Sequence, residues 1–459
     1  MALRSLAMPE GGDFLGAFSM SRTTALSVDG YAHTVRSHNS DPLTLAAAIA
    51  ASGHLTDYVV YEDGDRWYIA GNPIGAVTVG PDRLHSTLGG NHTESWCGNP
   101  WPRIHAALDR APVHRWRAYG WACFELCRPA TAAPDDILAH FMVPGVELEI
   151  THTAVHIRCL GGPFELDLPD TSAAVPAPRP VAVDAVDPAY LLRVEEALDR
   201  IRHGEFDKVI MSRRVDVPFA VDMPATYATV RRENTPARSF LLDLGGWQAA
   251  GVSPETVLEA DGDGLATTQP LAGTRARTGD AERDRALRDD LLSDPKEIYE
   301  HATSVRLAYT ELDSVGSTTR VSEFLTVKER GSVQHLASRV ETLLPADRTS
   351  WDALAAVYPA ITASGIPKAP ACAAIDDLEP GTRGLYSGAV VRADSTGFLD
   401  AALVLRAVYQ RGGRSWLRAG AGVVTGSTPA REYEETCEKL ACIAPYLVPA
   451  RSEKRGGHE

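Results

Sequence analysis

Four glutamates on two helical segments have the spacing of a metal site. In SDPKEIYEH, Glu297 and Glu300 are three residues apart, and in STPAREYEETCEKL, Glu432 and Glu435 are again three apart. At about 100° per residue, each pair lies on one face of a helix. Two such faces brought together would offer four carboxylates, the hard oxygen ligands that Mg²⁺ prefers.

Ordinary helix chemistry explains the same residues without a metal. Asp294 and Thr428 are each followed by proline, which predicts a helix N-cap and the first helical position. Glu297 would then be the far end of a capping box. Glu435 and Lys439 would be a surface ion pair four residues apart. Both interpretations remain open on spacing alone.

The helical period also divides the acidic residues of the second segment. Glu432, Glu435 and Lys439 fall within an arc of roughly 60°. Glu434 and Glu438 point elsewhere on the helix. We therefore expect the first group to carry any chemistry and the second group to be solvated.

Two basic residues lie on apolar faces of predicted strands. In DKVIMSRR, alternation puts Lys208 beside Phe206 and Ile210. An apolar environment favours the neutral amine, so Lys208 could act as a base, although an edge-strand lysine that prevents aggregation is the alternative. In DAALVLRAVYQ, Arg406 shares a face with Val404. A guanidinium there needs an anion, either a ligand carboxylate or an internal acid.

Glycine-bearing turns and one carboxylate complete the candidates. Gly273 and Thr274 follow a strand in QPLAGTRAR, and Gly420 and Gly422 end another strand in RAGAG. Neither segment fits the phosphate-loop or dinucleotide-binding patterns. The glycines either let a ligand approach the backbone or are simple turn residues. Glu255 follows a strand and a Ser-Pro turn in GVSPE, from which a carboxylate can project.

The elements that position these residues indicate the α+β class. Short apolar runs such as GVELEITHTAVHIRCLGG alternate and break at Gly, Asp or Pro, which predicts antiparallel hairpins. Residues 170–188 are rich in Pro, Ala and Val and form the candidate linker. Hairpins with helices segregated between them indicate a large antiparallel sheet system. The predicted helices lie near 188–206, 281–313, 351–359 and 429–445.

Composition excludes several classes of protein. The net charge of -15 disfavours a nucleic-acid or anionic-membrane partner, and an anionic substrate would need local cations or a metal. No apolar run reaches 18 residues, and MALRSLAMPEGGDF has no core for a signal peptide. We therefore expect a cytoplasmic protein without a membrane span. Seven scattered cysteines without a C-x-x-C pair predict reduced thiols and no zinc site.

Ten motifs, in this order, resemble those of the chorismate-utilising enzymes, which include anthranilate, aminodeoxychorismate, isochorismate and salicylate synthases. The motifs are DKVIMSRR, GVSPETV, QPLAGTRAR, DPKEIYEH, RGSVQHLAS, ITASGIPKAPA, RGLYSGAVV, DAALVLRA, RAGAGVV and EYEETCEKL. The resemblance is strong over residues 185–448. Chain length and the hairpin-rich N-terminal half also resemble the siderophore-type salicylate synthases. Gln269 departs from the pattern, since close relatives are expected to carry Glu before PLAGT.

The resemblance implies one α+β unit with a large antiparallel β-sandwich-like core and helices packed outside it. Residues 1–184 are then the N-terminal hairpin-rich half of that sandwich. Residues 185–450 are the chorismate-binding catalytic region, and 451–459 are a disordered tail.

The resemblance also implies roles for individual residues. Lys208 would activate water, and Glu255 would protonate the departing ring hydroxyl. Tyr386 and Arg406 would hold the enolpyruvyl carboxylate of chorismate. The implied Mg²⁺ ligands and their neighbours are Glu300, Glu435, Glu297 and Glu432. The remaining residues implied in the substrate pocket are Gly273, Thr274, His335, Thr362, Gly420, Gly422 and Lys439.

The branch within the family follows from the nucleophile. Ammonia-using members need no lysine to deprotonate water, so Lys208 favours a water nucleophile, and the sequence shows no glutaminase segment. PLAGTRA, RGSVQHL and EETCEKL look most like the salicylate synthases. The expected reaction is Mg²⁺-dependent conversion of chorismate through isochorismate to salicylate and pyruvate. An isochorismate synthase without the lyase step is the alternative. A monomer without a glutaminase subunit is expected, with salicylate used for a siderophore or another natural product.

Overall fold

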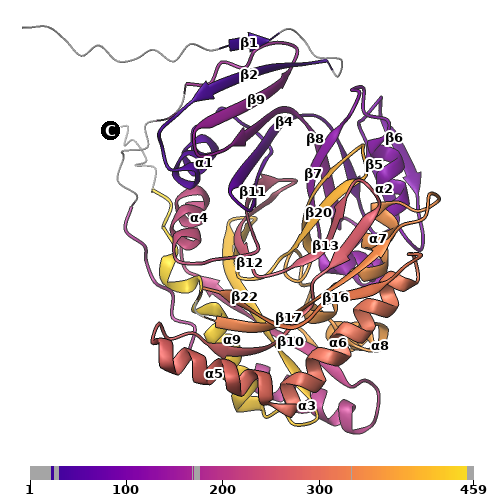
Figure 1. The fold of residues 1–459 in the computed structure, drawn as a ribbon, viewed down its shortest axis with the longest axis vertical. Helices are drawn as coiled ribbons and strands as arrows, with labels where there is room; N and C mark the ends of the chain where they lie inside the picture. The colour runs from indigo at the N-terminus through magenta and orange to yellow at the C-terminus, as the bar shows by residue number, and fades with distance from the viewer. Residues whose placement is uncertain (1–21, 25–29, 168, 170–175, 332, 452–459) are drawn as a thin grey trace, which may run out of the picture.

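Antiparallel pairing joins the strands of this chain, as the alternating hairpins predict. The computed structural model describes residues 22–24, 30–167, 169, 176–331 and 333–451. All its paired strands are antiparallel and form one hydrogen-bonded system from β1 to β22. The strands occupy the middle of the molecule and the helices lie outside them (Figure 1). The predicted α+β class with a large antiparallel core is confirmed.

The N-terminal part consists mainly of hairpins. Its strands are β1 (Arg22–Thr24), β2 (Tyr31–Ser37), β3 (Tyr58–Asp63), β4 (Arg66–Val79), β5 (Arg83–Ser86), β6 (His92–Ser95), β7 (Arg117–Ala122), β8 (Ala139–Ile150) and β9 (Ala154–Leu160). Its helices are α1 (Pro42–Ala51), α2 (Trp101–Leu108), η1 (Phe124–Cys127) and η2 (Pro129–Thr131). The sequence PLTLAAAIAA of α1 is apolar nearly all round and lacks a polar face. It therefore shows no helical period of apolar and polar residues from which a helix could be predicted.

The C-terminal part carries the longer helices. Its strands are β10 (Lys208–Val217), β11 (Arg238–Leu244), β12 (Trp247–Ser253), β13 (Thr256–Asp261), β14 (Leu265–Thr268), β15 (Leu271–Ala276), β16 (Arg320–Arg330), β17 (Val333–Leu343), β18 (Gly365–Ile366), β19 (Ala389–Asp394), β20 (Phe398–Leu403), β21 (Ala407–Arg411) and β22 (Arg414–Val424). Its helices are α3 (Pro188–Arg202), α4 (Met223–Arg232), α5 (Ala281–Ser293), α6 (Pro295–Asp313), α7 (Ser350–Val357), η3 (Ile361–Ala363), α8 (Lys368–Leu378), α9 (Pro429–Leu440) and η4 (Ala444–Tyr446). Helices α3, α5, α6 and α9 gather along one side of the strands (Figure 1).

Local signals explain where the two glutamate-bearing helices begin. Asp294 accepts the backbone N–H groups of Lys296 and Glu297 at the start of α6. Thr428 caps α9 in the same way, and a proline follows each cap. The helical region predicted near 281–313 therefore contains two helices, and the second begins at Pro295, as the predicted cap at Asp294 requires. Among the described helices, none is long and apolar enough to cross a bilayer.

Strand pairs cross the boundary expected at residue 184. β3 pairs with β11, and β7 pairs with β19. The described part of the predicted linker forms backbone hydrogen bonds with the C-terminal segment. The N–H of Arg179 donates to Leu447 O (2.7 Å), and the N–H of Val181 donates to Ala444 O (3.0 Å). Residues 170–175 of the linker and 452–459 of the predicted tail lie outside the described residues, as does the N-terminal segment 1–21.

Candidate active site

One cavity brings together every predicted site residue except Glu297 and Glu432. Its base is formed by β10 and β22, which pair so that Lys208 lies opposite Val424 and Ile210 opposite Gly422. Strands β15 and β17, the β20–β21 loop and helices α6 and α9 supply the other walls. The predicted residues therefore converge although they are spread from 208 to 439.

Lys208 lies at the start of β10 and is 5% exposed. β10 is paired on both sides, to β22 and β18, so the alternative of an edge-strand lysine is excluded. The Nζ atom donates to Glu300 Oε1 at 2.5 Å. A buried ammonium needs such a partner, and the pair keeps Lys208 aimed at the cavity.

Glu255 lies just after β12 and is 3% exposed. Its Oε1 accepts the hydroxyl of Thr362, and its Oε2 accepts the N–H of Leu271 at 3.0 Å. Burial raises the pKa of Glu255 to about 7, against the lowering effects of these hydrogen bonds and of the Arg406 charge. A carboxyl with a pKa near 7 can hold a proton and donate it at neutral pH.

Of the two candidate glutamates of α6, Glu300 lines the cavity and Glu297 lies beside it. Burial acts to raise the pKa of Glu300, but the adjacent Lys208 outweighs it, and the pKa lies below its ordinary value. Glu297 accepts from Arg275 at 3.0 Å and its pKa is raised by burial and by Glu300. The Glu297 side chain is therefore bound to an arginine and does not close a capping box.

The glutamates of α9 divide as the helical period predicts. Glu432 is 3% exposed, and Glu435 accepts from Lys439 Nζ at 2.8 Å. Glu434 and Glu438 are exposed and pair with Arg431. The predicted Glu435–Lys439 pair does form, but at the cavity rather than on an open surface.

Lys439 connects this helix to β22. Its Nζ also donates to Gly420 O at 2.8 Å. Burial acts to lower the pKa of Lys439, but Glu435 outweighs it, and the pKa is raised. The ammonium is therefore held charged beside the cavity, where an anion could reach it.

Arg406 does not lie in a continuous strand. β20 ends at Leu403 and β21 begins at Ala407, and Arg406 has a left-handed backbone (φ +48°). The prediction that alternation places Arg406 beside Val404 was therefore wrong. The guanidinium nevertheless lines the cavity, and no ion pair joins it to an acid of the described residues. Its Nη2 lies 3.1 Å from His335 Nε2.

His335 is held as a neutral imidazole. Burial and the Arg406 charge lower the pKa of His335 well below its usual value. A guanidinium can only donate, so Nε2 accepts and the ring hydrogen resides on Nδ1. That nitrogen lies 2.9 Å from Thr274 Oγ1. The histidine thereby fixes the positions of both Arg406 and Thr274.

Glycine keeps the cavity open at three places. Gly273 has φ +82° at a bulge in β15, and an added Cβ would lie 3.0 Å from Glu297. A Cβ at Gly422 would lie 3.1 Å from Lys208 Cε, and one at Gly420 would lie 2.8 Å from the Tyr386 hydroxyl. These glycines are therefore required for close approach and are not only turn residues.

The proposed metal ligands have suitable chemistry, but three of the four carboxylates form ion pairs with lysine or arginine side chains. Within the described residues, no three acidic, histidine or cysteine side chains converge closely enough to bind a metal. Glu300 and Glu435 line the same cavity, and the Lys439 charge acts on both. Burial raises the pKa of Glu297 and of Glu432, and repulsion from Glu300 and from Glu435, respectively, adds to this effect. This surplus of partly buried carboxylate oxygen fits a hard divalent cation.

Sequence reasoning missed Arg418, which also lines the cavity. Its Nε donates to Ser212 Oγ at 2.8 Å and its Nη2 to Glu379 at 2.5 Å. Strand alternation from Gly422 and Gly420 points to residue 418, so the signal was present in RAGAG. Gln269 does not line this cavity. It lies behind Glu255, around a small separate space that Thr362 also borders.

Comparison with known proteins identifies the family of this chain. The family model described as "chorismate binding enzyme" matches residues 57–445, and the chain belongs to that family. A salicylate synthase of Mycolicibacterium paratuberculosis is 44% identical over 89% of this chain and 94% of its own length. Anthranilate synthase component 1 of Thermus thermophilus is 41% identical, over 56% of this chain and 55% of its own length.

Solved structures show the same fold at low identity. The menaquinone-specific isochorismate synthase MenF of Escherichia coli aligns with a TM-score of 0.73 at 21% identity, covering 92% of this chain and 95% of that chain. Anthranilate synthase component I of Streptococcus pneumoniae aligns with a TM-score of 0.71 at 24% identity, and the alignment covers 83% of this chain and 92% of that chain.

Proposed function

We propose that this protein is a salicylate synthase, which converts chorismate through isochorismate to salicylate and pyruvate. The observation that carries the proposal is the 44% identity with a salicylate synthase along nearly the whole of both chains. The anthranilate synthase relative from Thermus thermophilus, in contrast, is matched over about half of its length. The cavity supports the proposal because the candidate base Lys208 and the candidate acid Glu255 line it together with three further cationic side chains, Arg406, Arg418 and Lys439.

In the first step, water replaces the ring hydroxyl of chorismate. Lys208, as the free amine, removes a proton from water while the water oxygen bonds to ring carbon 2. Both ring double bonds shift, from carbons 1–2 and 5–6 to carbons 1–6 and 4–5, and the hydroxyl at carbon 4 departs as water with the proton of Glu255. A pKa of about 7 keeps Glu255 partly protonated at neutral pH, as this role requires. Arg406 and Tyr386 bind the enolpyruvyl carboxylate and orient the ring.

In the second step, isochorismate loses pyruvate. The hydrogen on ring carbon 2 moves to the methylene carbon of the enolpyruvyl group as the bond between its oxygen and the ring breaks. The ring becomes aromatic, and no outside acid or base is consumed. Orientation is then the main requirement, and the rigid set of Arg406, His335 and Thr274 supplies it.

Mg²⁺ belongs to the proposal because of the carboxylates that face the cavity. Glu300 and Glu435 would hold the ion, with Glu297 and Glu432 beside them. A bound divalent cation neutralises and anchors a substrate carboxylate in an otherwise acidic protein. For Glu300 and Glu435 to bind the ion, their ion pairs with Lys208 and Lys439 must first open.

Product identification tests the function. Purified protein is incubated with chorismate and Mg²⁺, with and without ammonium, and the products are separated by chromatography. Salicylate with an equal amount of pyruvate is expected, with or without ammonium. Isochorismate alone would select the isochorismate synthase alternative, anthranilate would select the amine branch, and unchanged chorismate would refute the enzyme assignment.

Metal removal tests the cofactor separately. EDTA should abolish product formation, and added Mg²⁺ should restore it. Glu435→Gln should require more Mg²⁺ for half-maximal activity, whereas Glu434→Gln, on the exposed face of α9, should not. Full activity in EDTA would contradict the metal assignment.

We further propose that the protein is a cytoplasmic monomer that works without a glutaminase subunit.

A further inference from the structure

A second cavity adjoins the active site on the same face of β10 and β22. Along β22, Gly422 and Gly420 face the active site, and Arg418 and Trp416 continue the same alternation into the second cavity. This cavity has a volume of about 480 Å³, and Arg418 lines both spaces. We name it the arginine cavity after the seven arginines that line it: Arg193, Arg213, Arg214, Arg383, Arg411, Arg414 and Arg418.

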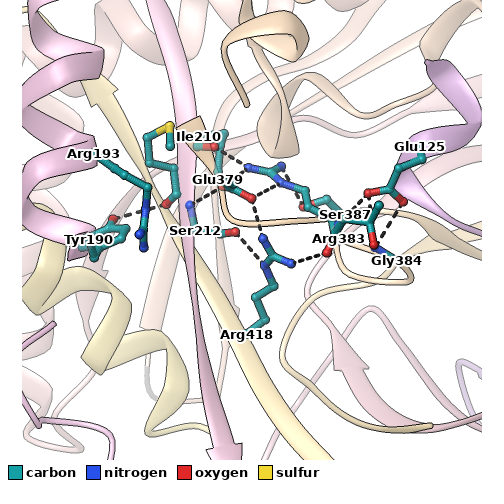
Figure 2. A network of polar contacts seen from close by, with 12 residues as sticks. Glu125, Tyr190, Arg193, Ile210, Ser212, Glu379, Arg383, Gly384, Ser387 and Arg418 are labelled. Carbon is teal, nitrogen blue, oxygen red and sulfur yellow. Dashed lines mark hydrogen bonds and ion pairs between the residues drawn. The ribbon is translucent and has the colours of Figure 1, made fainter. Parts of the chain in front are cut away.

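A buried polar network forms one wall of the arginine cavity (Figure 2). Arg383 and Arg418 share Glu379, each with a guanidinium nitrogen 2.6 Å or less from one of its oxygens. Glu125 and Asp136 are the acidic residues among those that line the cavity. Burial raises the pKa of Glu125, which already accepts backbone N–H groups of the 383–384 segment. Arg214 pairs with Asp216 at 2.7 Å. These acids still do not neutralise all seven arginines.

Two arginines at the mouth have no acidic partner in the described part of the chain. Arg411 and Arg414 lie directly opposite each other across the β21–β22 turn. Gly412 (φ +56°) and Gly413 (φ +75°) form that tight turn, so both side chains leave from one face. Like charges directly opposite each other destabilise a hairpin, and an anion between them would remove this cost.

Aromatic rings and unused donors complete the lining. The Arg411 guanidinium lies 4.9 Å from the centre of the Trp247 ring, and that of Arg214 lies 4.3 Å from Trp416. The indole N–H of Trp247, a residue only 4% exposed, has no hydrogen-bond acceptor among the described residues. The Nε of Arg193 also lacks an acceptor there, although its Nη2 lies 3.8 Å from a carboxylate oxygen of Asp187.

We propose that the arginine cavity binds a small anion through carboxylate or phosphate oxygens. The planar guanidinium fork matches either group, and the forks of Arg411 and Arg414, which have no acidic partner among the described residues, border one space of ligand size. The lining is assembled from several strands, loops and a helix around a concave space, which suits a small molecule rather than a nucleic acid. In a chain of net charge -15, such a concentration of cations is a local feature.

This site is distinct from the one proposed for chorismate but touches it. Arg418 separates the two cavities, and its guanidinium lies 5.6 Å from the Tyr386 ring, which lines the active site. An anion that draws Arg418 away from Glu379 would therefore change the surroundings of Tyr386. The ligand and chorismate are expected to influence each other's binding through this residue.

Calorimetric titration of the full chain in EDTA tests the proposal, with malonate and inorganic phosphate as separate probes. Saturable binding of at least one probe is expected. Whichever probe binds more tightly identifies the preferred group. The double variant R411Q/R414Q should weaken that binding at least about tenfold, since each lost charge-assisted hydrogen bond contributes strongly.

Two control variants locate the binding. Arg83→Gln removes an exposed strand arginine away from the cavity, and Arg406→Gln removes an arginine of the active site. Both should leave the affinity within about twofold of that of the parent protein. Binding that survives R411Q/R414Q unchanged, binding abolished by Arg406→Gln, or no saturable binding would each overturn the proposal. Thermal unfolding confirms that each variant is folded, and Arg414→Gln alone replaces the double variant if needed.

Discussion

At the scale of single residues, three ion pairs hold most of the charges in and beside the candidate active site. Lys208 lies on Glu300, Lys439 on Glu435, and Arg275 on Glu297. Each charge is at least partly buried and would be costly alone. The free protein therefore keeps these cations and carboxylates paired, and the proposed binding of chorismate and Mg²⁺ requires these ion pairs to open.

Lys208→Gln should lower the rate of salicylate formation by about 10²–10⁴-fold, the usual contribution of a general base. Glutamine keeps the length of the side chain nearly constant but cannot take a proton from water. The measurement is steady-state kinetics with chorismate and Mg²⁺. Lys328→Gln is the matched control, because Lys328 also pairs with a glutamate (Glu323, 3.2 Å) but does not line the cavity. Undiminished product formation by the first variant would remove Lys208 from the mechanism.

Thr362→Val should shift the alkaline limb of the pH–rate profile upward by roughly one unit. The Thr362 hydroxyl donates to Glu255 and so stabilises the ionised carboxylate. Without this donor, the pKa of Glu255 rises further above 7. A general acid works while it is protonated, so activity should persist to higher pH.

The control for this shift is Thr310→Val, which removes an exposed hydroxyl of α6. Its profile should match that of the parent protein. A downward shift in Thr362→Val, or an equal shift in both variants, would contradict the assignment of Glu255 as the acid.

At the scale of elements, the sequence predicted helix starts better than strand ends. Asp294 and Thr428 are local signals, since each cap binds N–H groups within three residues. The break between β20 and β21 depends on tertiary contacts. The backbone O of Arg406 accepts the N–H of Val252 on a neighbouring strand, and DAALVLRAVYQ contains no glycine or proline to announce the turn.

The same distinction explains which site residues were found. Lys208, Glu255 and the glutamates belong to motifs whose spacing or family resemblance placed them in the site. Arg418 required only alternation along β22, whereas Glu379 lies just after α8, in the segment between the motifs ITASGIPKAPA and RGLYSGAVV and part of neither. Its contact with Ser212 N (2.6 Å) spans 167 positions of the chain. No local pattern can predict such a contact.

Gly422→Ala tests how closely β22 must approach the base. The added Cβ would lie 3.1 Å from Lys208 Cε, and Gly422 has no left-handed backbone, so the strand itself is not strained. We expect kcat/KM to fall by about tenfold, since overpacking costs roughly 1–3 kcal/mol, with circular dichroism unchanged. Gly426→Ala is the control, because nothing lies within 4 Å of its added Cβ. Equal effects of both variants would show that the contact with Lys208 is irrelevant.

At the scale of the whole molecule, the N-terminal hairpins and the catalytic region form one structure. β3 and β7 pair with β11 and β19, so the hairpins complete the sheet that carries the site. Side chains cross the same boundary: Tyr61 donates to Asp400, and Arg238 pairs with both Asp400 and Asp63. The division at residue 184 therefore separates parts that share a core.

The segment 185–451 should consequently fail to fold as a monomer when it is produced alone. Removal of β3 and β7 exposes the edges of β11 and β19, which are templates for intermolecular pairing. The fragment also lacks Tyr61, whose hydroxyl donates to Asp400, and Asp63, which pairs with Arg238. Two charged side chains, those of Asp400 and Arg238, therefore each lose a partner. Size-exclusion chromatography should show aggregates, and co-production of residues 30–184 should restore a soluble complex. A monomeric fragment that unfolds cooperatively and forms salicylate would instead show that 185–451 is an independent domain.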